Sequence, residues 1–367
     1  MAEMENRKSA CIVRAYATGG AAMTNVHDIA ARSELMRRIA DLCGGTAGET
    51  AEVARPRELF VPDDTMLVEA AAAMGIFDAS QLYGGAVPAR FVATKVITHG
   101  LPFQGAQAPP EWSHALGGKL GDAVLRGFSV FSRADASAAG RLLLDHGPVR
   151  LKDVEATSGM GQTVVRDADD LDVEIDAMDA AVLAQTGLVI EENLTDVTTY
   201  SVGIATLFGM SIAYWGTQSL TLNNFEEEVY GGSHLRCVRG GWLQLRRLEL
   251  GPELAEVIDR AQHYDRAVSV AYPSMFASRR NYDVVSGLDG RGNKQIGVLE
   301  QSWRVGGASG AEIAAFEVFA AYPACTSVEA STVEIYGGAE QAPPGAAIYF
   351  SGIDPVLGPL IKYAMTR

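Results

Sequence analysis

The order of apolar and polar positions predicts strands and helices that alternate along most of the chain. From Ile29 to Leu42, apolar residues recur at the three- and four-residue spacing of an amphipathic helix. A short apolar strand at 59–61 is followed by a PDDT loop and an alanine-rich helix at 66–74. Strand, loop and helix in this order are typical of an α/β unit, so we expect an α/β N-terminal part.

The middle of the chain predicts a hairpin around a glycine-rich loop. A strand at 147–152 ends in Lys152, the loop at 153–162 reads DVEATSGMGQ, and a second strand begins with TVV. A helix over 173–186 and a strongly apolar strand over 188–190 follow. The N–H groups of a glycine-rich loop can approach phosphates, and an adjacent ammonium can reach the phosphate oxygens. Taken alone, this lysine is equally compatible with a solvated strand end, and the Walker pattern GxxxxGK[ST] is absent.

A second hairpin, nearer the C-terminus, is the most informative stretch. Alternating strands from 198 and a helix over 253–271 precede RRNYDVVSGLDGRGNKQIGVLEQSWRVGG, which predicts two strands joined by a DGRGN turn. The turn should bring Asp283 and Glu300 together, and Arg279, Arg280 and Arg304 flank them. Paired carboxylates offer the hard oxygens that Mg²⁺ prefers. The alternative for this pair alone is a set of surface ion pairs on an edge strand.

Composition narrows the class of protein. The chain has 367 residues, of which 48% are hydrophobic and 20% charged, as in a globular protein with two or three subdomains. Its 45 acidic and 30 basic residues give a net charge of −15, which makes nucleic acid and membrane surfaces poor partners. Neither a signal-peptide-like stretch nor a run long enough to span a bilayer is present, and the four cysteines show no CxxC pairing. We expect a cytoplasmic protein.

Other catalytic motifs find no support in the sequence. The six histidines form no HExxH pattern, and no GxSxG occurs. These absences leave a zinc hydrolase or an α/β-hydrolase without its characteristic residues.

The succession of candidate residues resembles the ATP-grasp superfamily. That resemblance rests on the order of Lys95, Lys152 with its glycine-rich loop, the apolar strand into Glu191, and then Arg280, Asp283 and Glu300. More narrowly, the phrases LFVPDDT, GPVRLKDVEATSGMGQ, RRNYDVVSG and GVLEQSWRVGGASGAE resemble a proteobacterial family of unknown function, DUF3182. The narrower resemblance runs from about residue 58 to the C-terminus.

This resemblance implies a fold that mixes α/β and α+β parts. An N-terminal α/β domain of the pre-ATP-grasp type, residues 1–92, would precede two α+β subdomains that sandwich ATP. The first subdomain, 93–190, would carry the glycine-rich loop, and the second, 191–367, would carry the metal-binding hairpin.

The resemblance also implies how the nucleotide would be held. Lys95 and Lys152 would contact the α- and β-phosphates, the loop would cover the triphosphate, and Glu191 would sit at the adenine hinge. The full set of implied nucleotide-binding residues is Lys95, Lys152, Ser158, Gly159, Met160, Gly161, Gln162, Glu191, Glu192 and Leu194.

The remaining candidates would hold the metal and the substrate. By resemblance, Asp283 and Glu300 would bind Mg²⁺, and Ser302, two residues after Glu300, would be the third metal-binding residue. Arg280, or its neighbour Arg279, would stabilise the charge that develops on the γ-phosphoryl group. Arg304 would hold a substrate carboxylate.

The implied activity is that of a Mg·ATP-dependent ligase. Such an enzyme activates a small-molecule carboxylate as an acyl phosphate, which an amine or a similar nucleophile then attacks. Related enzymes often read Glu-x-Asn on the last strand, whereas this chain reads Glu300-Gln301-Ser302. Related enzymes also often carry an acidic residue that contacts the ribose, and the matching position here falls near Thr198, which is not acidic. Two alternatives therefore stay open, a catalytically impaired nucleotide-binding regulatory or scaffold protein and a small-molecule kinase. The acid and the nucleophile are not specified, and a homodimer is the default assembly.

Overall fold

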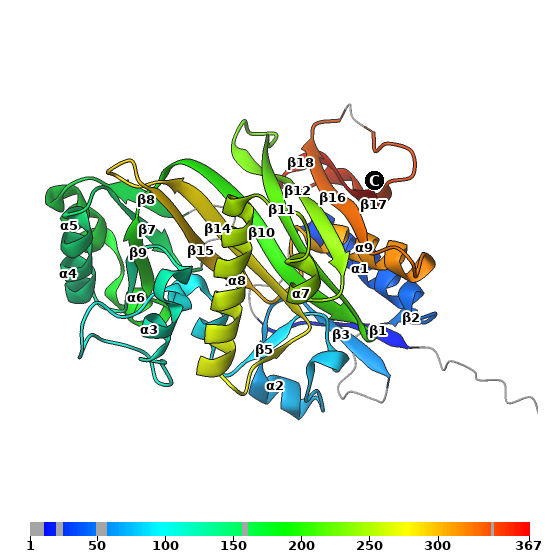
Figure 1. Ribbon diagram of the computed structural model, residues 1–367, viewed down its shortest axis with the longest axis horizontal. Helices are drawn as coiled ribbons and strands as arrows, with labels where there is room; N and C mark the ends of the chain where they lie inside the picture. The colour runs from blue at the N-terminus through cyan, green and yellow to red at the C-terminus, as the bar shows by residue number, and fades with distance from the viewer. Residues whose placement is uncertain (1–10, 20–24, 49–56, 156–160, 339–340) are drawn as a thin grey trace, which may run out of the picture.

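The N-terminal sheet of the computed structural model is a small parallel one (Figure 1). The structure describes residues 11–19, 25–48, 57–155, 161–338 and 341–367. In this sheet, of order β2-β1-β3, the strands are β1 (Ile12–Tyr16), β2 (Thr46–Gly48) and β3 (Glu58–Pro62), and the helix α1 (Val26–Leu42) follows β1. A second three-stranded sheet contains β4 (Met66–Leu67), β5 (Gly85–Val87) and β13 (Phe276–Ala277), next to α2 (Val68–Ala73).

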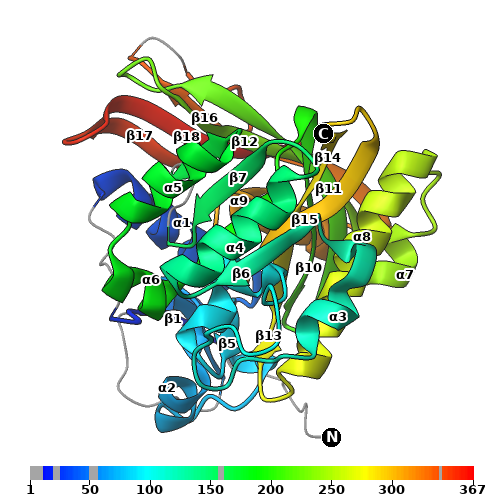
Figure 2. The same cartoon turned by 90° about the vertical axis from the view of Figure 1, so that its left-hand side faces the viewer.

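A four-stranded antiparallel sheet of order β6-β9-β7-β8 follows. Its strands are β6 (Gly127–Val130), β7 (Val149–Asp153), β8 (Gln162–Val165) and β9 (Leu188–Glu192). One face packs its apolar residues against α4 (Arg133–Leu144), α5 (Ala168–Ala177) and α6 (Ala180–Thr186), as Figure 2 shows from the helix side. Ser132, Asp167 and Asp179 cap these helices, because each side chain accepts a hydrogen bond from a backbone N–H in the first turn.

The largest sheet has eight strands in the order β15-β14-β10-β11-β12-β16-β18-β17. The strands are β10 (Thr195–Leu207), β11 (Met210–Leu222), β12 (Glu228–Arg239), β14 (Arg279–Leu288), β15 (Lys294–Ser302), β16 (Ser327–Tyr336), β17 (Ala347–Asp354) and β18 (Gly358–Thr366). The helix α8 (Pro252–Ala271) packs on one face, and α9 (Ser309–Ala321) with α1 packs on the other. Two separate apolar cores result, one on each side of the sheet.

Short helices complete the described chain. They are the α-helices α3 (Leu116–Leu120) and α7 (Trp242–Leu245) and the 3₁₀ helices η1 (Ala79–Gln81), η2 (Arg90–Ala93), η3 (Lys95–Thr98) and η4 (Gly121–Ala123). Of these, η3 carries candidate site residues.

Most of the predicted elements are present, with three local differences. The helix predicted at 66–74 begins only at Val68, because Met66 and Leu67 form β4. The helix predicted over 173–186 is two helices, since Asp179 caps a new helix and interrupts the first. In α1, Ile29 was predicted to lie on the buried face but is exposed, while Leu35 and Ile39 are buried as predicted.

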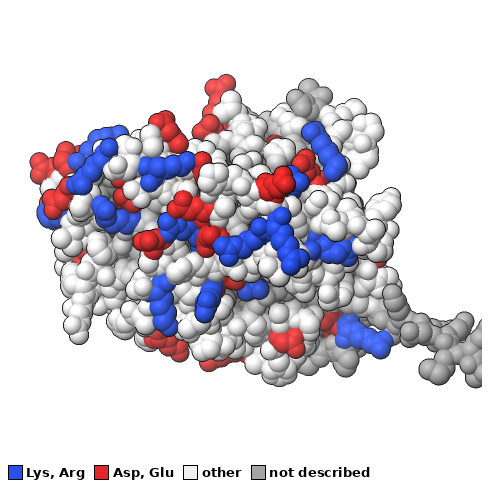
Figure 3. Space-filling model, in the orientation of Figure 1, with Lys and Arg blue, Asp and Glu red and all other residues white. Residues whose placement is uncertain are grey.

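The surface carries charges of both signs. Figure 3 shows Lys and Arg side chains interspersed with Asp and Glu on the face that carries α8. Within the described ranges, no helix has both the length and the apolar composition that a bilayer crossing requires.

A buried charged cluster joins α1 to the C-terminal hairpin. The Nδ1 atom of His27 lies 2.8 Å from an oxygen of Asp354, and its Nε2 atom lies 3.0 Å from Asp28. Lys362 contacts Asp28 at 3.2 Å and Glu334 at 3.1 Å. Burial alone would lower the pKa of His27, but the bonds to Asp28 and Asp354 outweigh it, so the pKa lies above its ordinary value.

The stability of the fold should therefore depend on the charge of His27. Because the pKa is raised by folding, the contribution is complete below the ordinary pKa of histidine and is lost as the pH rises through the higher folded value. We expect His27→Gln to cost more stability at about pH 5.5 than at about pH 9. Urea unfolding of both proteins at the two pH values measures this, and an equal difference at both would contradict the assignment.

Candidate functional site

The segment from Lys95 to His99 lies between the two larger sheets and contacts both. Lys95, in η3, is buried, and its Nζ atom lies 3.1 Å from a carboxylate oxygen of Glu300 on the eight-stranded sheet. Four residues on, the Nε2 atom of His99 lies 3.1 Å from a carboxylate oxygen of Glu191 on the four-stranded sheet. This segment therefore brings the candidate residues of both sheets into one region.

A buried ion pair marks the four-stranded side of this region. The ammonium of Lys152 contacts Glu191, and both side chains are buried. Burial alone would raise the pKa of Glu191, but Lys152 and His99 outweigh it and hold the pKa at about 2. The carboxylate of Glu191 thus stands at the end of the apolar strand, as expected, but it is turned inward to Lys152. Arg150 lies two residues before Lys152 on β7, and its guanidinium donates to Gln162 and Asn193.

Two carboxylates face each other on the eight-stranded side. Asp283 and Glu300 are direct partners across the antiparallel pair β14–β15, as the predicted hairpin requires. The Oδ1 atom of Asp283 accepts hydrogen bonds from Ser201 at 3.3 Å, Gln218 at 3.0 Å and Asn281 at 3.1 Å. All three of these donors reach the same oxygen, Oδ1. Burial and then the nearby Glu300 raise the pKa of Asp283 to about 6, as expected of a carboxylate pair that attracts a cation.

The structure pairs Arg280 with a residue of α8. Side chains alternate between the two faces of a strand, and Arg280 lies three positions before Asp283 on β14. The two side chains therefore point to opposite faces of the sheet. Its Nη1 atom lies 3.0 and 3.2 Å from the two oxygens of Asp265 on α8, and Tyr282 donates to the same carboxylate. Arg280 is therefore held on the sheet face that packs against α8.

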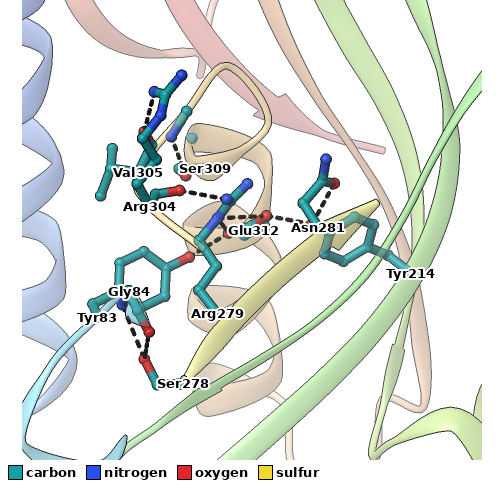
Figure 4. A network of polar contacts seen from close by, with 12 residues as sticks. Tyr83, Gly84, Tyr214, Ser278, Arg279, Asn281, Arg304, Val305, Ser309 and Glu312 are labelled. Carbon is teal, nitrogen blue, oxygen red and sulfur yellow. Dashed lines mark hydrogen bonds and ion pairs between the residues drawn. The ribbon is translucent and has the colours of Figure 1, made fainter. Parts of the chain in front are cut away.

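Arg279 shares the face of Asp283 but is already paired (Figure 4). Its Nε atom donates to both oxygens of Glu312 on α9, at 2.8 and 3.1 Å, and both residues are at most 1% exposed. Its Nη1 atom donates to the backbone oxygen of Arg304. Arg279 thus holds the loop that follows β15, which is a structural role in place of the predicted contact with phosphate.

Arg304 is the candidate arginine whose side chain is most accessible. It is 39% exposed, and its Nε atom lies 3.7 Å from Asp64, in the PDDT loop of the N-terminal part. The guanidinium lies two residues after Ser302, and its Nη1 atom donates to the backbone oxygen of Val305 at 3.2 Å. Ser302 lies opposite Asn281 in the strand register and is half-buried.

The connection from β9 to β10 forms a hinge between the two sheets. Glu192 accepts a hydrogen bond from the backbone N–H of Arg126 at 3.0 Å and lines an outer groove of about 610 Å³ beside α8. Leu194 is buried in a small apolar cluster with Leu125 and Val285. The hinge therefore combines peptide groups with an apolar surface.

The glycine-rich loop is described only at its two ends, at residues 153–155 and 161–162. Ser158, Gly159 and Met160 lie outside the described residues. Gly161 has a φ of 63° and its backbone oxygen accepts from Asp153, while Gln162 begins β8. The loop thus joins the strand of Lys152 to β8, as the sequence predicts.

Several site residues escaped the sequence argument. Asn281 could have been found, because it stands two residues before Asp283 on the same face of a strand. His99, Ser201, Gln218 and Glu312 could not, since their contacts depend on elements that are distant in sequence.

The fold is that of the ATP-grasp enzymes. The chain matches N5-carboxyaminoimidazole synthetase from Staphylococcus aureus complexed with ADP, with 10% identity and a TM-score of 0.53 over 98% of this chain and 93% of that one. It matches phosphoribosylamine–glycine ligase from Thermotoga maritima with 11% identity and a TM-score of 0.54, over 97% and 92%. For the biotin carboxylase domain dimer of Hydrogenobacter thermophilus 2-oxoglutarate carboxylase, the values are 12%, 0.55, 97% and 86%.

Within this fold, the particular family is also defined. Residues 15–364 match the family described as "Protein of unknown function (DUF3182)", and the chain belongs to it. No curated protein matches the chain.

Proposed function

We propose that this protein is a Mg·ATP-dependent ligase that activates a small-molecule carboxylate. The observation that carries this proposal is the meeting of Asp283 and Glu300, in register on one hairpin, with the ammonium of Lys95. A pair of carboxylates beside a lysine provides for a divalent cation and for the phosphates that it accompanies. The similarity of the whole chain to ATP-grasp structures supports the same proposal at the level of fold.

The nucleotide would bind between the four-stranded and eight-stranded sheets. The peptide groups from Glu192 to Leu194 would contact the edge of the adenine, and the apolar cluster with Leu125 and Val285 would contact its face. Lys95 and Lys152 would contact phosphate oxygens, and Arg150 adds a third cation on the same face of β7 as Lys152. The glycine-rich loop would close over the triphosphate.

The carboxylate pair fits Mg²⁺. Among the described residues, no group of three or more His, Cys, Asp or Glu side chains is placed to hold a metal ion. Mg²⁺ usually takes one or two carboxylates and completes its shell with water and phosphate oxygens, which is what Asp283 and Glu300 allow. When bound, the ion would neutralise charge on the phosphates. Ser302 would contribute through its hydroxyl or through water.

The protein would then act mainly by positioning and charge. Arg304 would hold the substrate carboxylate next to the γ-phosphate, and the acyl phosphate formed there would be attacked by an amine or a similar nucleophile. Residues 1–92 would shape part of the substrate site, because Asp64 contacts Arg304. From the similarity to ATP-grasp enzymes, we also infer domain boundaries after residues 92 and 190 and a homodimeric assembly.

One observation favours a second candidate, a nucleotide-binding protein with impaired catalysis. Arg279 and Arg280 are both committed to buried carboxylates, and Ser302 replaces the asparagine of related enzymes. Arg304 would then be the only one of the three predicted arginines left for the reaction. A small-molecule kinase would use the same nucleotide site and differs only in its product.

The test is release of ADP from Mg·ATP in the presence of panels of small carboxylic acids, with and without amines. We expect at least one acid to stimulate ADP release, and we expect Glu300→Gln to abolish that stimulation. A phosphorylated product that is stable without an amine would identify a kinase. Tight nucleotide binding with no stimulation by any acid would favour the impaired protein.

A further inference from the structure

A chain of hydrogen bonds leads from the buried core to the oxygen of Asp283, and Figure 4 shows its members Glu312, Arg279, Tyr214 and Asn281. Glu312 is fully buried and paired with Arg279. The hydroxyl of Tyr214 lies 2.6 Å from an oxygen of Glu312 and 2.9 Å from the Oδ1 atom of Asn281. The Nδ2 atom of Asn281 donates to Asp283 at 3.1 Å. Two strands, β11 and β14, and the helix α9 therefore contribute residues to the chain that ends at Asp283.

The orientation of the Asn281 amide is set at both of its ends. Its NH₂ group must face Asp283, since the opposite orientation would set the amide oxygen against a carboxylate oxygen. Its oxygen then faces the phenol of Tyr214. Burial and then the charge of Glu312 raise the pKa of Tyr214 well above its ordinary value, so the phenol stays protonated. Its single proton is shared between Oε1 of Glu312 and Oδ1 of Asn281. The phenol therefore favours the amide orientation that serves Asp283.

The Tyr214 ring is held in place by its own packing. Tyr214 is fully buried and lies opposite Gly203 on the neighbouring strand. A Cβ atom at Gly203 would come 2.4 Å from the hydroxyl oxygen and from the ring carbon that bears it. Glycine at this position provides the space that the ring occupies. The phenol can therefore act as a fixed donor, because neither the ring nor its carboxylate anchor is free to move.

We propose that Tyr214 is a positioning residue for the metal site, which orients Asn281 and through it the metal-binding carboxylate of Asp283. This inference rests on the proposed function, because it takes Asp283 to be a metal ligand. Hydrogen-bond partners one step behind a metal ligand typically contribute 10- to 100-fold to metal affinity. Tyr214 is two steps behind, so an effect at the lower end, about tenfold, is expected.

A matched pair of substitutions separates positioning from stability. Tyr83 donates its hydroxyl proton to Glu312, whereas Tyr214 shares its one proton between Glu312 and Asn281, and both tyrosines are fully buried. Tyr214→Phe and Tyr83→Phe each remove one hydroxyl from the same carboxylate. A purely structural role would make the two variants behave alike.

The experiment measures Mn²⁺ binding to the full chain by electron paramagnetic resonance, with ADP present at saturation. We expect Tyr214→Phe to bind Mn²⁺ about tenfold more weakly than the wild type, and Tyr83→Phe to stay within about twofold. If Tyr214→Phe does not fold, Asn281→Ala decides, since it removes the amide and leaves the bond from Tyr214 to Glu312; the same loss is expected. If the variant that folds binds Mn²⁺ as tightly as the wild type does, the positioning role of Tyr214 is overturned. The proposed metal site is unaffected by that outcome. A wild type that binds ADP but no Mn²⁺ overturns the metal site itself.

Discussion

Replacing Arg279 with methionine is expected to lower the free energy of unfolding by about 3 to 5 kcal/mol. Arg279 is buried on the sheet face and Glu312 is buried on α9, so the substitution leaves a carboxylate in the core without its cation. Tyr83 and Tyr214 continue to donate to Glu312, but phenols do not neutralise its charge. Urea unfolding followed by circular dichroism measures the loss.

Two controls make this result specific to the buried pair. Arg141 and Asp172 form an ion pair of good geometry in which both side chains are about half exposed. Arg141→Met should therefore cost less than about 1 kcal/mol. The double variant Arg279→Met/Glu312→Leu should recover part of the loss, because it removes the unpaired charge as well. A loss below about 1 kcal/mol in Arg279→Met would show that the pair is not buried as described.

Replacing Lys152 with methionine should also cost about 3 kcal/mol or more, because among the described residues it leaves the buried Glu191 with His99 as its remaining charged partner. The loss should depend on pH. Lys152 and His99 hold the pKa of Glu191 at about 2, so the stabilisation is present above the ordinary pKa of glutamate and disappears as the pH falls toward the folded value. The unfolding free energies of wild type and variant should therefore converge in acid.

The lower stability expected of Lys152→Met complicates its use as a test of the proposed nucleotide site. A simple loss of nucleotide binding in Lys152→Met would be ambiguous, since the variant is also expected to be less stable. The double variant Lys152→Met/Glu191→Gln removes both charges and should be more stable than the single one. If the double variant folds and still fails to bind nucleotide, Lys152 contacts the ligand. If it binds as the wild type does, Lys152 is a structural residue only.

The sequence predicted those parts of the site that depend on local geometry. The pairing of Asp283 with Glu300 follows from a short turn between two strands, and the turn sets which residues are opposite. The position of Lys152 at the end of a strand before the glycine-rich loop follows from the alternation of apolar and polar residues. Both depend on residues that are close in the chain.

The rest depends on contacts that no local pattern specifies. Arg280 and Arg279 are neighbours in sequence, yet one pairs with Asp265 on α8 and the other with Glu312 on α9. Strand alternation shows that they point to opposite faces, but which face meets the nucleotide depends on how the helices pack. The contact of Arg280 with a γ-phosphoryl group stays a prediction. In the same way, the inward turn of Glu191 requires His99, which belongs to a segment about ninety residues earlier.

The proposed function requires a Mg²⁺-dependent nucleotide site at the carboxylate pair. The most direct measurement is calorimetric titration of a non-hydrolysable ATP analogue into the wild type and into Glu300→Gln, with Mg²⁺ and again with EDTA. We predict that the wild type binds only with Mg²⁺ and that Glu300→Gln binds at least tenfold more weakly. Absence of binding at millimolar analogue, or binding that is the same with EDTA and in Glu300→Gln, would contradict the account.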